Sequence, residues 1–386
     1  MQVYILLNFI KIVLHIRRSS VLTHEDRLET LFSFPNFPVY AGCVSSPEIE
    51  DNLLDLQVDI CKDTGILQLK HVPSIEQVYL FAHNDAIGRT WKEHNEQFAN
   101  FIRKFEPTKV LEIGGGSGKL AKICLEKNKN YDWTILDPNP LYEDESTLHS
   151  IKKYFSSDIK FDDDFDMIVH SHVIEHILNP QQFLKDISKY LVPGNLHIFS
   201  FPNMKVWLQK KYLNCIMFEH SIFLIEDYLD IMLKKTGFKI IEKFYFKDDH
   251  SIFYATKFIG NPIDADFPNL YQKNKILYSE FIKYYQNFVK EINSKINDFP
   301  GKVYLFGAHL FSQYLLSFGL NQNKIDGILD NSSLKIGKRL YGSKLKVFHP
   351  DHIKNEKCAI ILKVGSYHDE IIEQLKQINP SAEVYQ

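Results

Sequence analysis

A glycine-rich turn is the part of this sequence whose residues most clearly suit chemistry. It reads Glu112-Ile113-Gly114-Gly115-Gly116-Ser117-Gly118-Lys119-Leu120 and follows a short apolar run. Glycine takes positive φ without strain and lets a ligand approach the main chain, which is typical of a cofactor site. A phosphate-binding P-loop needs glycine where Ile113 stands, and a dinucleotide loop needs its third glycine where Lys119 stands. The remaining pattern is Glu-x-Gly-x-Gly-x-Gly, and Asp137 ends the next apolar run; strand–helix packing without a ligand is the alternative.

A histidine-rich segment, His170-Ser171-His172-Val173-Ile174-Glu175-His176, matches the H-x-x-E-H pattern of inverted zinc peptidases. That pattern needs both histidines on one helix face and a third ligand from elsewhere. The apolar run before His170 predicts a buried strand, so His172 falls in the following loop. We therefore expect no metal site here, with His172 lining the pocket of the glycine turn and His176 packed.

Two cysteines resemble a degraded zinc knuckle. Cys43 and Cys61 each lack the second thiol of a C-x-x-C pair, with Ser46 and Thr64 in its place. A hydroxyl is a poor zinc ligand beside thiolate, so we expect no zinc at this site. Apolar packing would then hold this small region together, through Leu53, Leu54, Ile60, Ile66, Leu67 and Leu69.

The elements that must position these residues alternate between short apolar runs and helical periods, which predicts an α/β protein with a doubly wound parallel sheet. We expect strands at 110–113, 133–136, 167–170 and 196–200, a closing hairpin at 238–246 and 251–258, and a long amphipathic helix over 271–297. A helix is expected within 79–105. A second α/β unit follows, with strands at 303–306, 327–329 and 359–364 and a helix ending near 318.

Composition excludes several classes of protein. The chain has 386 residues, 45% hydrophobic and 24% charged, which fits a globular protein of two or three domains. Lys and Arg number 45 against 48 Asp and Glu, a net charge of −3 that argues against general nucleic-acid binding. Five cysteines are too few for a disulfide scaffold, and free thiols favour a cytoplasmic location.

The first sixteen residues are mostly apolar and precede Arg17-Arg18. Their charge order is the reverse of a secretory signal, and the run is too short to span a bilayer. Asn8, Lys11 and His15 would share one face of a helix. We expect a docked helix or an extension upstream of the native start, with membrane-surface contact as the alternative.

With Asp137 included, the glycine turn resembles that of class I S-adenosylmethionine (SAM)-dependent methyltransferases. The resemblance implies SAM as cofactor, with the turn facing its methionine part and Asp137 accepting hydrogen bonds from the ribose hydroxyls. The implied cofactor residues are Glu112, Gly114, Gly115, Gly116, Gly118, Asp137, Pro138 and His172.

At full length the chain resembles nucleotide-sugar C-methyltransferases from about Pro38 to its end. The resemblance rests on the cysteine outline, on Phe218-Glu219-His220-Ser221-Ile222-Phe223, and on segments such as Phe306-Gly307-Ala308-His309 and Ile328-Leu329-Asp330-Asn331. It implies an extension at 1–37, a small degenerate zinc-knuckle-like domain with a connecting helix at 38–105, and a SAM-binding domain at 106–260. A helical linker at 261–298 and a Rossmann-like substrate domain at 299–386 complete the predicted order.

The same resemblance implies roles for residues at the acceptor. His220 is the expected base that removes a proton next to a ketone, and Glu219 a substrate binder or alternative base; on an extended strand the two would point apart. The expected further contacts to the substrate are Tyr79 as a catalytic residue and His83, His250 and Asp330 as binding residues.

The expected function is therefore methylation, at carbon, of a nucleotide-linked keto-deoxysugar in surface-polysaccharide or glycoside biosynthesis. The acceptor would be a small molecule rather than nucleic acid. Two alternatives stay open: a sugar or small-molecule O-methyltransferase, and a SAM-binding assembly partner that has lost catalysis. A surface glutamate beside a half-buried histidine is the non-functional interpretation of Glu219 and His220.

Overall fold

A computed structural model describes residues 2–7, 10–79, 88–128, 130–142, 146–161, 164–365 and 368–386. The chain divides into two compact units, each discontinuous in sequence. The central unit comprises Phe81–Val206 and Leu224–Pro268, and the terminal unit comprises Met1–Leu80, Trp207–Phe223 and Asn269–Gln386. This division differs from the predicted succession of domains, because a short segment from the middle of the chain belongs to the terminal unit.

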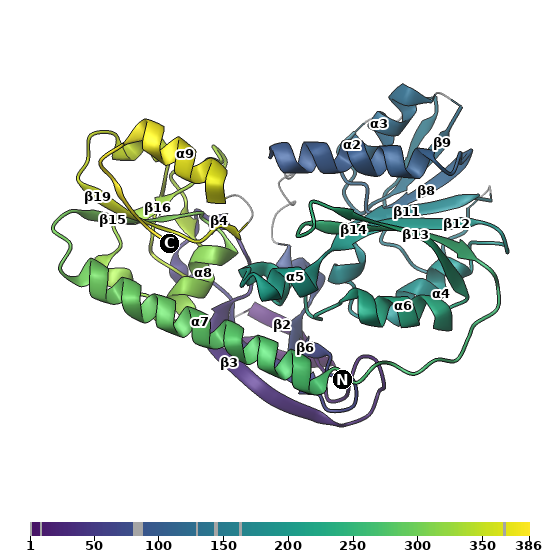
Figure 1. Cartoon of the computed structure of the whole chain (residues 1–386), viewed down its shortest axis with the longest axis horizontal. Coiled ribbons are helices and arrows are strands. Elements are labelled where there is room, and N and C mark those ends of the chain that lie inside the picture. The colour runs from purple at the N-terminus through teal and green to yellow at the C-terminus, as the bar shows by residue number, and fades with distance from the viewer. Residues whose placement is uncertain are drawn as a thin grey trace. The chain divides into compact units, whose positions relative to one another are not determined.

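The central unit is built on a seven-stranded sheet of order β10-β9-β8-β11-β12-β14-β13, in which β14 pairs antiparallel with β12 and with β13 and the other pairs are parallel. Helices α2 and α3 cover one face and α4 and α6 the other (Figure 1). The central strands are almost wholly buried because helices cover both faces. The strands are β8 (Lys109–Ile113), β9 (Asp132–Leu136), β10 (Leu148–Ile151), β11 (Met167–Ser171), β12 (Leu196–Pro202), β13 (Phe238–Phe246) and β14 (Ser251–Phe258). The helices are α2 (Arg89–Arg103), α3 (Lys119–Lys127), η2 (Ile174–His176), α4 (Pro180–Ser188) and α6 (Glu226–Lys235). Helix α5 (Met204–Gln209) begins in the central unit and ends in the terminal unit.

The predicted doubly wound sheet and the closing hairpin are confirmed. The hairpin has the predicted bounds, and its register shifts once, between Ile240 and Glu242. The helix predicted within 79–105 begins at Arg89; residues 80–87 lie outside the described part of the chain.

The terminal unit contains a five-stranded parallel sheet of order β18-β16-β15-β19-β20 and three small sheets: β1-β2-β7, β3-β5-β6 and β17-β4. The long helix α7 spans the predicted residues, and its buried side chains recur at helical spacing. The strands in the first segment of this unit are β1 (Gln2–Leu7), β2 (Ile10–Ile16), β3 (Leu28–Pro38), β4 (Cys43–Val44), β5 (Leu53–Cys61), β6 (Leu67–Leu69) and β7 (His71–Pro73). The later strands are β15 (Lys302–Phe306), β16 (Gly327–Leu329), β17 (Arg339–Leu340), β18 (Val347–Phe348), β19 (Cys358–Leu362) and β20 (Glu383–Tyr385). The helices are η1 (Glu48–Glu50), α1 (Ile75–Val78), η3 (Leu213–Cys215), α7 (Tyr271–Asn297), α8 (Leu310–Ser317), η4 (Gln322–Lys324), η5 (Pro350–Ile353) and α9 (His368–Ile378).

The apolar N-terminus forms strands, so the expectation of a docked helix is wrong. Strands β1 and β2 pair antiparallel, and β2 also pairs with β7. The helix was predicted wrongly because the few polar residues of this short apolar run fit both a helical and a strand periodicity. Pairing of β2 with β7 favours the strand. Within the described residues, no helix is long and apolar enough to cross a membrane.

The two cysteines of the predicted knuckle are buried thiols in different surroundings. The Cys43 thiol lies 3.4 Å from the carbonyl oxygen of Ala308, and burial raises its pKa to about 12. The pKa of Cys61 is lowered, because hydrogen bonds from Ser20 and Thr64 outweigh the opposing effect of burial. Neither cysteine belongs to a group of three metal-ligating side chains among the described residues.

Candidate functional site

The glycine turn has the backbone geometry that its sequence predicts. Gly114, Gly116 and Gly118 have φ of +75°, +49° and +70°, values that other residues rarely adopt. Gly118 caps the start of α3. Gly115 has an ordinary φ, but a Cβ there would lie 2.6 Å from Ile135 Cγ2 and 2.9 Å from Glu112 Cδ. The turn at the carboxyl end of β8 is therefore held in a shape that suits glycines.

Asp137 follows β9, the strand next to β8, and its carboxylate faces the turn. Oδ2 accepts a hydrogen bond of 3.0 Å from the Gly116 N–H, and Oδ1 accepts one of 2.7 Å from the Asn139 N–H. A carboxylate has about four lone-pair sites, so this one can still accept from the two hydroxyls of a ribose. Pro138 lies beside it, half-buried. Asp137 therefore keeps acceptor capacity at the position where the sequence predicts the ribose of SAM.

Glu112 lies beneath the turn. Its side chain is buried, and Oε2 accepts a 2.8 Å hydrogen bond from Trp133 Nε1. Burial raises the pKa of Glu112 to about 7; the Trp133 hydrogen bond opposes the rise, and the charge of Asp137 adds to it. The position suits a residue that supports the turn from below.

His172 lies in the loop after β11, as predicted, and its φ of +53° is unusual for a residue with a side chain. Its Nδ1 is 3.0 Å from Glu175 Oε1 and its Nε2 is 2.8 Å from Ser251 Oγ. The next residue, Val173, contacts the glycine turn: a Cβ on Gly114 would lie 2.7 Å from Val173 Cγ2. His172 is therefore next to the predicted cofactor site.

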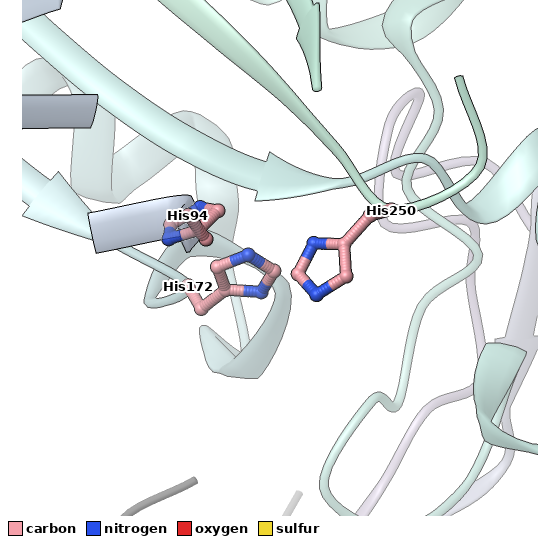
Figure 2. Close-up of side chains that lie close together, drawn as sticks. All are labelled: His94, His172 and His250. Carbon is pink, nitrogen blue, oxygen red and sulfur yellow. The ribbon is translucent and has the colours of Figure 1, made fainter. Parts of the chain in front are cut away.

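Three histidines from three separate elements meet beside this loop (Figure 2). His94 comes from α2, His172 follows β11, and His250 lies in the β13–β14 turn. The Trp91 ring packs edge-on against all three, with centroids 4.8 to 5.3 Å away. Sequence analysis placed His250 at the substrate and missed His94, because one histidine on an amphipathic helix gives no signal by itself.

Ser200 and Ser251 complete this cluster, and sequence analysis missed both. Ser251 Oγ lies 2.6 Å from His250 Nδ1, and Ser200 Oγ lies 2.9 Å from His94 Nε2. Burial holds the pKa of His94 well below its ordinary value and lowers that of His250 to about 3; the His172 charge acts in the same direction on both. Burial therefore favours the neutral imidazole at His94 and at His250.

Glu219 and His220 belong to the terminal unit, where both side chains are buried. The expectation of an extended strand is wrong, because the segment bends through both residues. His220 Nδ1 lies 2.7 Å from the carbonyl oxygen of Asn214. A carbonyl only accepts, so Nδ1 carries the proton and Nε2 is the basic nitrogen. Glu219 acts electrostatically on Tyr40, a tyrosine that sequence analysis missed and whose pKa burial raises to about 12.

The remaining predicted substrate residues are dispersed. Tyr79 is half-buried just after α1, and His83 lies outside the described residues. Asp330 follows β16, and its carboxylate is occupied within the fold: it accepts from the N–H groups of Ala308 and Ser332 and pairs with Lys335 at 2.9 Å. This arrangement suits a structural carboxylate at the end of the strand.

Solved structures with some similarity to this chain include several methyltransferases. N-methyltransferase NodS of Bradyrhizobium japonicum WM9, in complex with S-adenosylhomocysteine, is 14% identical over 45% of this chain and 93% of its own length, with a TM-score of 0.36. Human N-acetylserotonin methyltransferase in complex with SAM is 14% identical over 43% of this chain and 52% of its own, with a TM-score of 0.37. An O-methyltransferase family protein of Burkholderia thailandensis is 11% identical over 46% and 59%, with a TM-score of 0.39. No curated protein matches the sequence.

Two protein families match the sequence in succession. A methyltransferase domain matches residues 85–243, and a C-methyltransferase C-terminal domain matches residues 269–382. The first contains the glycine turn, Asp137, His94 and His172, and the second contains α7 and the strands β15, β16, β18 and β19 of the parallel sheet. Together with the sheet order, these matches show that the chain is a SAM-dependent methyltransferase of class I that carries the C-terminal domain of C-methyltransferases.

Proposed function

We propose that this enzyme methylates a nucleotide-linked keto-deoxysugar at carbon, in the cytoplasmic biosynthesis of a surface polysaccharide or glycoside. The observation that carries the proposal is the tautomer of His220. Its Nδ1–H is held by the Asn214 carbonyl at 2.7 Å, so Nε2 presents a lone pair. The match of residues 269–382 to a C-methyltransferase C-terminal domain favours carbon as the atom that receives the methyl group.

The burial of Glu219 and His220 supports the same assignment. Their exposed fractions are 8% and 7%. Tyr40, close enough to sense the Glu219 charge, offers a phenol that keeps its proton at neutral pH and can donate a hydrogen bond.

A basic pocket in the terminal unit supports a nucleotide diphosphate on the acceptor. It has a volume of about 270 Å³, and Lys210, Lys211, Lys363 and Gly365 are among its lining residues. Lys363 and Gly365 follow β19, at the carboxyl end of a parallel strand, where open α/β sheets bind ligands. Tyr212 and Tyr285 add aromatic surface suited to a nucleobase.

In the proposed reaction, His220 is the group that removes the proton from the substrate. Its Nε2 takes the proton from the carbon next to the ketone, and the C–H electron pair becomes the enolate. Tyr40 or Glu219 holds the sugar by hydrogen bonds. SAM supplies the methyl group from its sulfonium, which becomes a neutral thioether when the methyl group is transferred. The enolate carbon gains the methyl group, and His220 returns its proton to solvent.

Proton exchange tests the base separately from methyl transfer. The enzyme is incubated in D₂O, without SAM, with a panel of nucleoside-diphosphate keto-deoxysugars, and deuterium next to the ketone is followed by NMR. His220→Asn keeps an N–H for the Asn214 carbonyl but removes the base. We expect exchange by the native enzyme and a loss of about 100-fold or more in the variant.

His71→Asn is the matched control, because His71 lies in the same unit and its Nδ1 is also bonded to a carbonyl, that of Asp55, at 3.2 Å. It should exchange like the native enzyme. Equal exchange by the native enzyme and His220→Asn would remove His220 as the base. Mass spectrometry of products formed with SAM then shows whether the methyl group sits on carbon; a methyl on oxygen would replace this proposal with O-methylation.

A further inference from the structure

We propose that His94, His172 and His250 bind a divalent transition-metal ion, with Zn²⁺ as the best match. Each residue offers one ligand atom, and the three atoms lie within 4.8 Å of one another. Sequence analysis expected no metal anywhere in this chain. The site becomes visible only because α2, the loop after β11 and the β13–β14 turn converge (Figure 2).

Ser251 links two of the rings. Its Oγ lies 2.8 Å from His172 Nε2 and 2.6 Å from His250 Nδ1. A serine hydroxyl has one proton, so Ser251 can donate to only one of these two rings.

His94 Nε2 lies 2.9 Å from Ser200 Oγ, and its Nδ1 lies 3.3 Å from Asn95 Oδ1. Each of the three rings offers one nitrogen to the cluster. Imidazole nitrogens are among the preferred ligands of Zn²⁺, Co²⁺, Ni²⁺ and Cu²⁺.

The surroundings of the cluster suit a metal ion. The contact between Glu175 and His172 is the carboxylate–histidine pair that orients ligands around zinc. Zinc–nitrogen bonds of about 2.0–2.1 Å would bring the nitrogens to about 3.4 Å from one another, so small ring movements close the site.

The position of the site couples it to the cofactor. Val173, adjacent to His172, packs against Gly114 of the glycine turn. Movement of His172 onto a metal therefore acts on the turn, and we expect a filled site to change the affinity for SAM. By linkage, SAM changes the affinity for the metal by the same factor. The metal site does not depend on the acceptor, so its failure would leave the proposed function intact, and the reverse also holds.

Metal titration of untagged, chelator-treated, full-length protein tests the proposal. We expect one Zn²⁺ per chain with a dissociation constant below about 10 μM by calorimetry, and Co²⁺ should give the intense visible absorption of a four-coordinate site. Trp91 touches all three rings, so Cu²⁺ or Ni²⁺ should quench its fluorescence. Trp91→Phe should abolish that quenching and keep the stoichiometry.

His250→Gln and His172→Gln should each weaken Zn²⁺ binding at least 100-fold, and Glu175→Gln should weaken it about 10-fold. His149→Gln is the control, since His149 is a half-exposed histidine of the same unit that pairs with Asp132. Circular dichroism checks that each variant is folded. Absence of stoichiometric binding, or equal loss in His149→Gln and His250→Gln, would overturn the metal site.

Discussion

The buried carboxyl of Glu112 should make the stability of the central unit fall as pH rises. Its pKa is raised from an ordinary 4.5 to about 7, with burial as the main cause. The folded state therefore binds this proton more tightly than the unfolded chain. The contribution to stability is complete below pH 4.5 and is lost as the pH rises through 7.

The size of the effect follows from the same two values. A pKa difference of one unit corresponds to about 1.36 kcal/mol. Between pH 5.5 and pH 8, a group that titrates at 4.5 unfolded and about 7 folded lowers the free energy of unfolding by about 2 kcal/mol. Glu112→Gln keeps an oxygen for the Trp133 N–H but cannot ionise, so it lacks this loss.

Urea unfolding at pH 5.5, 6.5 and 8, followed by the fluorescence of buried Trp133, measures the difference. The free energy of unfolding of Glu112→Gln relative to the native protein should rise by about 2 kcal/mol over that range. Glu126→Gln, an identical change on the exposed face of α3, should track the native protein at every pH. A native-minus-variant difference that stays constant with pH would refute the reasoning.

Three further predictions address the core and the cofactor turn. Burial lowers the pKa of His197 to about 3, so between pH 7.5 and pH 5 only the unfolded chain gains this proton. The free energy of unfolding should therefore fall by about 2 kcal/mol from pH 7.5 to pH 5. His197→Phe should remove this pH dependence in acid unfolding curves. Gly115→Ala forces a Cβ to 2.6 Å from Ile135, so it should lower the free energy of unfolding by about 1–3 kcal/mol, and an unchanged melting temperature would contradict the close packing. Asp137→Asn removes one oxygen of the carboxylate that bonds the Gly116 N–H and that we propose binds the ribose of SAM, so calorimetry should show SAM binding about 10- to 100-fold weaker, whereas retained affinity would place the ribose elsewhere.

Elements whose signals are local could be predicted from the sequence. The glycine turn, the hairpin from Phe238 to Phe258 and the helix Tyr271–Asn297 all lie where their patterns place them. Each depends on the conformational freedom of particular residues or on a hydrophobic period within one segment. The N-terminal strands were missed because a short apolar run with few polar residues carries no decisive period.

The grouping of distant residues was decided by the tertiary structure alone. The sheet order β11-β12-β14 sets Ser171 beside Ser200 and Pro202 beside Ser251, and so brings the loop of His172 to the turn of His250. No hydrophobic periodicity in the sequence predicts that strand order, because strand pairing depends on the packing of all the elements against one another. The sequence therefore determined the cofactor turn and the type of fold, while the histidine cluster and the base tautomer of His220 depend on contacts between segments far apart in the chain.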